Sequence, residues 1–184
     1  MHGEHGALDV DAEDLVEVRL ADLTESMGIS RKSMYAAFGN KEELFQKALQ
    51  LYSQGPSAYI AEALRAPTAR EAARIFLTGS VQSNTQSGYP AGCLGVQGAL
   101  AVGETGRPAR DALAEWRRRG QLHLRERFQR AVREGDLPVS ADPDLIARYV
   151  MTIANGMAVQ ATGGTTREEL QQVADAALLN WPPG

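Results

Sequence analysis

Apolar side chains recur at intervals of three and four residues along most of this 184-residue chain, the spacing of one face of an α-helix. Leu20, Leu23 and Met27 show it in a first short segment, with polar residues between them. The same spacing returns in residues 68–82, 108–134, 143–162 and 165–178. Strand-like alternation is confined to residues 16–20, and no internal repeat is present. The pattern predicts an all-α fold.

Glycine, proline and short polar residues mark the ends of these helices. Gly28 can take the positive φ of a helix C-cap, and Ser30 can cap a second short helix at residues 31–37. Two short helices therefore meet at a tight turn. A long helix is predicted from residue 41 to about residue 64, with a kink or an interruption at Pro56. Further helix starts are marked by Asn40 with Glu43, Thr68 with Glu71, Pro108 and Asp142-Pro143. Helices are separated or ended by a polar loop at 83–92, a break at 103–106, Gly135 with Pro138, and Gly163-Gly164.

Composition and charge place the chain among globular proteins. It is 43% hydrophobic and 23% charged, with a formal net charge of -4. No apolar run reaches the roughly 18 residues of a spanning helix, and the first residues lack the basic start and apolar core of a signal peptide. We therefore expect a cytoplasmic protein with no membrane partner. The charge is uneven, because residues 1–17 hold six acids and no Lys or Arg, whereas residues 19–47 hold five bases against four acids.

The run LADLTESMGISRKSMYAAFGNKEELFQKAL, at residues 20–49, is the most informative part of the chain. Its elements are a Leu-Ala-x-Leu first helix, the Gly28-Ile29-Ser30 turn, a Ser33-x-Tyr35-x-x-Phe38 second helix and the Asn40-Lys41-Glu42-x-Leu44 cap. In this order they closely resemble the helix-turn-helix of the tetracycline-repressor-like (TetR) family, followed by the start of its long fourth helix. The resemblance implies a helix-turn-helix module at residues 1–47, with a shortened first helix at residues 9–17. It also implies a larger helical effector-binding and dimerisation domain at residues 48–184.

A DNA duplex is read by a helix whose N-terminal side chains reach base edges while flanking groups hold phosphates. The DNA-contact candidates are Ser30, Arg31, Lys32, Ser33, Tyr35 and Lys41. Arg31 and Lys32 are the first candidates for readout, because Arg can make two hydrogen bonds to guanine and Lys serves a guanine or a phosphate. Tyr35 and Lys41 resemble the family's phosphate contacts. For Tyr35, packing against neighbouring helices is an equal alternative.

The resemblance also implies a cavity between the middle helices and a four-helix bundle made by the last two helices of each subunit. The cavity candidates are Tyr59, Phe76, Leu77, Tyr89, Leu94, Trp116 and His123. For each of them, ordinary core packing is the alternative. The dimer-face candidates are Ile146, Tyr149, Val150, Ile153, Met157, Leu170, Val173 and Ala177.

Cys93 is the only cysteine, which excludes a disulfide within the chain. It follows a Gly-rich loop near a helix start, a setting that can activate a thiol, so it is a candidate redox or electrophile sensor. A small buried residue is the alternative. The three histidines are dispersed, and no catalytic triad, phosphate loop or spaced carboxylate pair is visible. We therefore expect no enzymatic activity, no cofactor and no metal.

Two functional hypotheses remain open at the level of sequence. The first is a ligand-responsive transcriptional regulator, a repressor, that binds double-stranded operator DNA as a homodimer and is released by a small apolar effector. The second is a helical dimer with impaired or lost DNA binding that binds a small molecule or a partner protein. The acidic residues 1–17 favour the second hypothesis, because they bring negative charge toward DNA phosphates.

Overall fold

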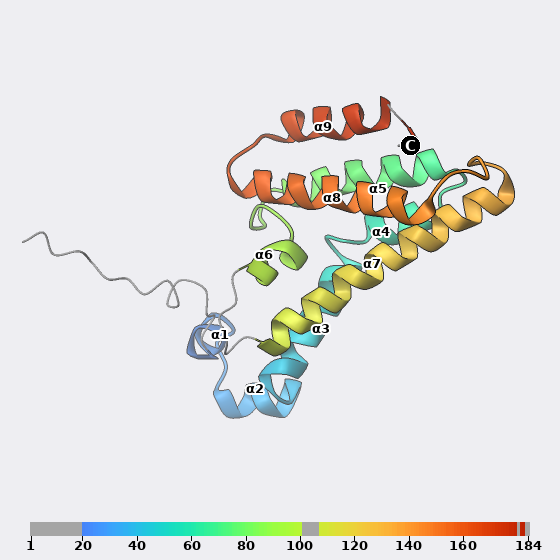
Figure 1. Ribbon diagram of the computed structural model, residues 1–184. Coiled ribbons are helices and arrows are strands. Elements are labelled where there is room, and N and C mark those ends of the chain that lie inside the picture. The colour runs from blue at the N-terminus through green and yellow to red at the C-terminus, as the bar shows by residue number, and fades with distance from the viewer. Residues whose placement is uncertain (1–19, 101–106, 180, 183–184) are drawn as a thin grey trace, which may run out of the picture.

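The computed structural model describes residues 20–100, 107–179 and 181–182. Every regular element within these residues is a helix (Figure 1), which confirms the predicted all-α fold. The helices are α1 (Leu20–Ser26), α2 (Arg31–Phe38), α3 (Lys41–Gln54), α4 (Tyr59–Arg65), α5 (Ala69–Asn84), α6 (Leu94–Leu100), α7 (Arg107–Glu134), α8 (Pro143–Thr162) and α9 (Arg167–Leu179). The helix expected at residues 9–17 and the break expected at residues 103–106 lie outside the described residues.

Several helices begin at the caps that the sequence predicts. Thr68 Oγ1 accepts a hydrogen bond from the backbone N–H of Glu71 at 3.2 Å, directly before α5. Asp142 Oδ1 accepts from the backbone N–H groups of Asp144 and Leu145, at 2.9 and 3.2 Å, directly before α8. These acceptors satisfy N–H groups that have no partner inside the helix, so each helix starts at a defined residue.

The long helix predicted from residue 41 is interrupted at Pro56. α3 ends at Gln54 and α4 begins at Tyr59. Proline has no N–H to donate to the preceding turn, and its ring clashes with the carbonyl four residues back, so a regular helix cannot continue. The backbone N–H of Ser57 donates to the carbonyl of Tyr52 at 3.0 Å and leads the chain into α4.

The hydrophobic core lies among α4, α5, α7, α8 and α9, in the upper part of Figure 1. α5 packs against α4, α8 and α9, and α7 packs against α8. The largest fully buried apolar side chains of this core are Phe128, Leu77, Leu124, Ile146, Met157, Leu170, Val81 and Val150. Burying such a side chain contributes roughly 1.5–3 kcal/mol. We refer to α4–α9 as the helical body.

The structure differs from the expectation for the twofold interface. Five of the expected dimer-face residues lie in the chain's own core: Ile146, Val150, Met157, Leu170 and Ala177. α8 and α9 pack against α5 of the same chain, and α8 also packs against α7, so these side chains are buried within one subunit. Tyr149 and Ile153 are partly buried against the same core, whereas Val173 is exposed. Helical spacing identifies a buried face, but it does not say which chain buries it.

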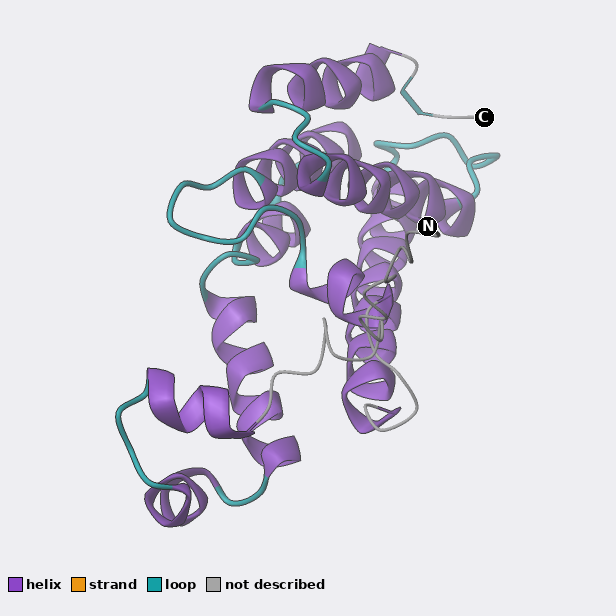
Figure 2. Ribbon diagram, turned by 90° about the vertical axis from the view of Figure 1, so that its left-hand side faces the viewer, coloured by secondary structure: helices purple, strands orange, loops and turns teal. Residues whose placement is uncertain are grey.

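α1, α2 and the start of α3 form one end of the molecule, at the lower left of Figure 1 beside the first turns of α7. Figure 2 shows this end from the side, joined to the body through α3. Met34 of α2 is fully buried and packs within this end. The boundary expected after residue 47 falls inside α3, so one continuous helix belongs to both regions.

Candidate nucleic-acid interface and ligand cavity

The turn between α1 and α2 is set by two local features. Gly28 has a φ of 64°, a left-handed conformation that favours glycine. Ser30 then caps α2, because its Oγ accepts a hydrogen bond from the backbone N–H of Ser33 at 3.0 Å, and the two hydroxyls lie 2.9 Å apart. This cap engages the Ser30 hydroxyl, and Arg31 and Lys32, the first two residues of α2, are both exposed.

The six DNA-contact candidates are all exposed and lie on or beside α2. Tyr35 is 45% exposed, so its ring is not enclosed by neighbouring helices. α2 contains two cations and no Asp or Glu. Lys41 is the first residue of α3, where Asn40 Oδ1 accepts from the N–H of Glu43 at 2.8 Å. The helix start leaves other N–H groups facing outward, which suits a phosphate oxygen.

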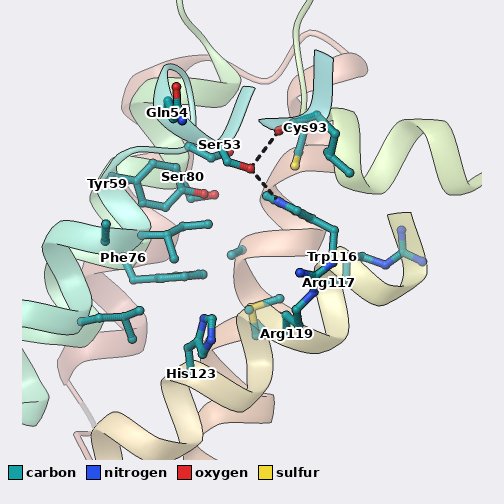
Figure 3. Close-up of a pocket in the computed structure, with 18 of the residues that line it drawn as sticks. Ser53, Gln54, Tyr59, Phe76, Ser80, Cys93, Trp116, Arg117, Arg119 and His123 are labelled. Carbon is teal, nitrogen blue, oxygen red and sulfur yellow. Dashed lines mark hydrogen bonds between the residues drawn. The ribbon is translucent and has the colours of Figure 1, made fainter. Parts of the chain in front are cut away.

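A cavity of about 660 Å³ lies between α3, α4, α5, α7 and α8. Figure 3 shows Tyr59 and Phe76 on one side of it and Trp116 and His123 on the other. The structure therefore brings these four predicted cavity residues together, and Cys93 lines the same space. Its volume lies within the roughly 300–1,000 Å³ typical of small-molecule sites.

Three predicted cavity residues lie elsewhere. Leu77 is in the core of the helical body, because it follows Phe76 and therefore points about a quarter turn further round α5. Tyr89 is 57% exposed in the connection between α5 and α6. Leu94 begins α6 and is not among the residues that line the cavity, although its backbone N–H donates to Tyr52 Oη at 3.4 Å. The aromatic or apolar character of a residue therefore does not predict whether it lines the cavity or lies in the core.

Two glycines allow the cavity's aromatic rings to approach their neighbouring helices. A Cβ added at Gly79 of α5 would lie 2.5 Å from Tyr59 Cβ and Cγ. A Cβ added at Gly95 of α6 would lie 2.5 Å from the ring of Trp116. Real Cβ atoms do not approach carbon atoms so closely, so glycine at both positions lets the rings sit where they border the cavity.

A polar group of side chains lies at the α3 side of the cavity. Trp116 Nε1 donates to Ser53 Oγ at 2.9 Å, and Tyr52 Oη donates to Cys93 Sγ at 3.5 Å. Burial raises the pKa of the Tyr52 hydroxyl to about 12, and the neighbouring Cys93 adds to that rise. Burial also raises the pKa of Tyr59 above its ordinary value. Both phenols therefore remain neutral hydrogen-bonding groups near pH 7.

Sequence reasoning missed several residues that line the cavity: Ser53, Ser57, Ser80, Arg117, Arg119, Met151 and Asn155. A signal for Arg119 was present. Trp116 and His123 were both predicted, and position 119 falls between them at the i+3 and i+4 spacing of one helix face. Serines and small residues carry no such signal, because they occur on any helix face.

Within the part of the chain that the structure describes, no group of three or more His, Cys, Asp or Glu residues is placed to hold a metal ion. Among the helices of those same ranges, none combines the length and the apolar character needed to span a membrane.

Comparisons with known proteins agree with this geometry. The family model "Tetracyclin repressor-like, C-terminal domain" matches residues 73–177. CifR, a TetR family transcriptional regulator solved as a cysteine mutant with 26-bp double-strand operator DNA, has a TM-score of 0.83 and 39% identity, covering 89% of this chain and 86% of that one. A TetR transcriptional regulator from Rhodococcus sp. RHA1 has a TM-score of 0.66 and 39% identity, covering 90% and 89%. The HTH-type transcriptional repressor ComR of Escherichia coli (strain K12) is 26% identical over 165 residues, 89% of this chain and 79% of ComR.

Proposed function

The chain belongs to the tetracycline-repressor-like family of transcriptional regulators, and we propose that it is a repressor that binds operator DNA as a dimer and is released by a small ligand. The observation that carries this proposal is the position of α3. Its first residue, Lys41, stands beside α2, and further along it Leu49 and Ser53 line the cavity. A ligand in the cavity therefore contacts the helix that holds α2 in place.

In this proposal α2 enters the major groove. Arg31 and Lys32 contact base edges, while Tyr35 and Lys41 hold phosphates on either side. The exposed, carboxylate-free surface of α2 supports this assignment. The operator complex of CifR supports it by analogy, since CifR shares 39% identity with this chain.

The dimer places two copies of α2 one helical turn of DNA apart, roughly 34 Å. We propose that the subunits meet through apolar side chains that α8 and α9 leave exposed, Val159 and Val173 among them. A charge buried in such an interface is costly. Val173→Glu should therefore weaken the dimer by at least about tenfold in sedimentation velocity. Val139→Glu is the control, because Val139 is 90% exposed in the α7–α8 connection, and equal weakening by both variants would contradict this interface.

The ligand acts by preferring one arrangement of α3 and α2 over another. A ligand shifts such an equilibrium only by the difference in its affinity for the two arrangements. Leu49 is buried, so a change in how the cavity is filled is passed to α3 through packing. Release of the operator follows when the favoured arrangement no longer matches the half-site spacing.

The second candidate function is a helical dimer that binds a small molecule or a partner protein without binding DNA. The six acids and absence of Lys or Arg in residues 1–17 favour it, since this charge opposes approach to phosphates. It predicts ligand-induced thermal stabilisation with no operator at all.

Fluorescence anisotropy with the intergenic DNA upstream of the gene separates the two candidates. The repressor binds specifically, and its affinity falls steeply with salt because phosphate contacts release counterions. Arg31→Ala should weaken specific binding about tenfold or more. Arg133→Ala, which changes an exposed arginine in the last turn of α7, is the control. Absence of specific binding at low salt would overturn the repressor proposal and leave the second candidate.

A further inference from the structure

The cavity combines an apolar interior with a charged opening. Phe76, Met151 and Ala154 are buried side chains that line its interior. Lys47, Arg119 and His123 also line it, but they are exposed and therefore stand at its opening. Figure 3 shows Arg119 and His123 together on α7 beside the cavity. This arrangement fits a ligand with an apolar body and one polar end.

The charge at the opening has one sign. The lining residues include Lys47, Arg117 and Arg119 together with His123, and no Asp or Glu is among the described residues that line the cavity. A cationic ligand is repelled by such a surface, and an anionic ligand is attracted. Arg117 donates to the backbone carbonyl of Gly95, which is neutral, so this contact does not cancel its charge.

Arg119 is the cation best placed to meet a ligand. Its neighbour Arg118 holds Glu115 through two hydrogen bonds of 2.7 and 2.8 Å, one to each carboxylate oxygen. Arg119 approaches the same carboxylate only at 3.3 Å. Since Arg118 already occupies Glu115, Arg119 has donors left for the cavity, and His123 lies one helical turn further along the same face of α7.

We propose that the effector is a small amphipathic anion, a carboxylate or comparable oxyanion on an apolar body, whose charged end pairs with Arg119 at the cavity opening. This inference rests on the proposed function in treating the bound molecule as the effector. The charged end of the ligand can also act on Lys47, which lies near the end of α2. Its Nζ lies 5.6 Å from the centre of the Phe38 ring at the end of α2, so an anion at the opening competes with the ring for this ammonium group.

Isothermal titration calorimetry on the 184-residue chain tests the proposal without DNA, so its result does not depend on repression. The probes are two matched pairs, 4-phenylbutyrate with 4-phenylbutanamide and octanoate with 1-octanol. Each carboxylate should bind about tenfold tighter than its neutral partner, because a charge-assisted hydrogen bond is about twice as strong as a neutral one. Arg119→Gln should remove this preference, and Arg119→Lys should retain part of it.

Arg133→Gln is the control, because Arg133 is an exposed arginine in the last turn of the same helix, α7, and does not line the cavity. It should change carboxylate affinity by less than about twofold. The proposal is overturned if neutral probes bind as tightly as carboxylates, if neither carboxylate binds at millimolar concentration, or if Arg133→Gln and Arg119→Gln weaken binding equally. If the carboxylates bind as expected and the operator is never bound, the ligand class stands and the repressor proposal fails.

Discussion

The helix-turn-helix end (α1, α2 and the start of α3) and the helical body differ greatly in how many side chains they bury. Among the described side chains of α1 and α2 the buried one is Met34, and Leu49 of α3 is also buried. The helical body buries whole faces of α5, α7, α8 and α9 around Phe76 and Phe128. A small end with little core of its own depends on α3 for its position. Under the proposed function, this difference would let a ligand in the cavity move α2 without unfolding the protein.

The largest expected effect is a loss of stability in the helical body. Phe128→Ala removes a fully buried ring that lies 5.7 Å from the ring of Trp181. The cavity left behind should lower the free energy of unfolding by about 3–5 kcal/mol. Urea denaturation followed by circular dichroism measures it. Phe38→Ala, at the half-buried end of α2, is the comparison, and it should cost clearly less. Equal losses would contradict the division of stability between the two regions.

A smaller loss of stability is expected from a substitution beside the cavity. Gly79→Ala places a methyl group 2.5 Å from Tyr59 Cβ and Cγ, so α4 and α5 must separate. Overpacking of this kind costs about 1–3 kcal/mol. Gly120→Ala is the control, since a Cβ at Gly120 of α7 meets nothing within 4 Å and alanine favours a helix. Thermal denaturation should show Gly79→Ala destabilised and Gly120→Ala unchanged or stabilised. The opposite order would show that the Tyr59 contact does not limit the cavity.

The smallest effect is confined to the helix-turn-helix end. Ser30→Ala removes the cap of α2 and should destabilise that helix by about 1 kcal/mol. Hydrogen exchange should therefore accelerate at α2 amides and stay constant in α5 and α8. Ser30→Asn, which keeps a capping acceptor, should restore the protection of α2. Faster exchange throughout the molecule after Ser30→Ala would show that the two regions unfold together.

The same two regions differ in how much the sequence reveals. The turn at Gly28, the cap at Ser30 and the start of α3 follow from local hydrogen bonding and backbone conformation, and the structure has them where the sequence predicts them. Local chemistry determines these features, because their partners are three or four residues away.

The packing of the helical body is harder to predict from the sequence, because its contacts join residues that are far apart in the chain. Helical spacing predicted that one face of α8 and of α9 is buried, but Val150 and Leu170 lie in the hydrophobic core of the same chain. Likewise, Phe76 borders the cavity and Leu77, the next residue, lies in the core. Such choices depend on how helices cross, which a single-chain pattern does not encode.

The central claim is that filling the cavity changes how α2 meets DNA. Operator affinity is measured by anisotropy on one protein sample, with and without 4-phenylbutyrate, while calorimetry on the same sample verifies that the cavity is occupied. Linkage requires that the ligand weakens DNA binding by the same factor by which DNA weakens ligand binding. We predict an increase of about tenfold or more in the operator dissociation constant, equal in both directions within error. An unchanged dissociation constant with the cavity fully occupied would contradict the account.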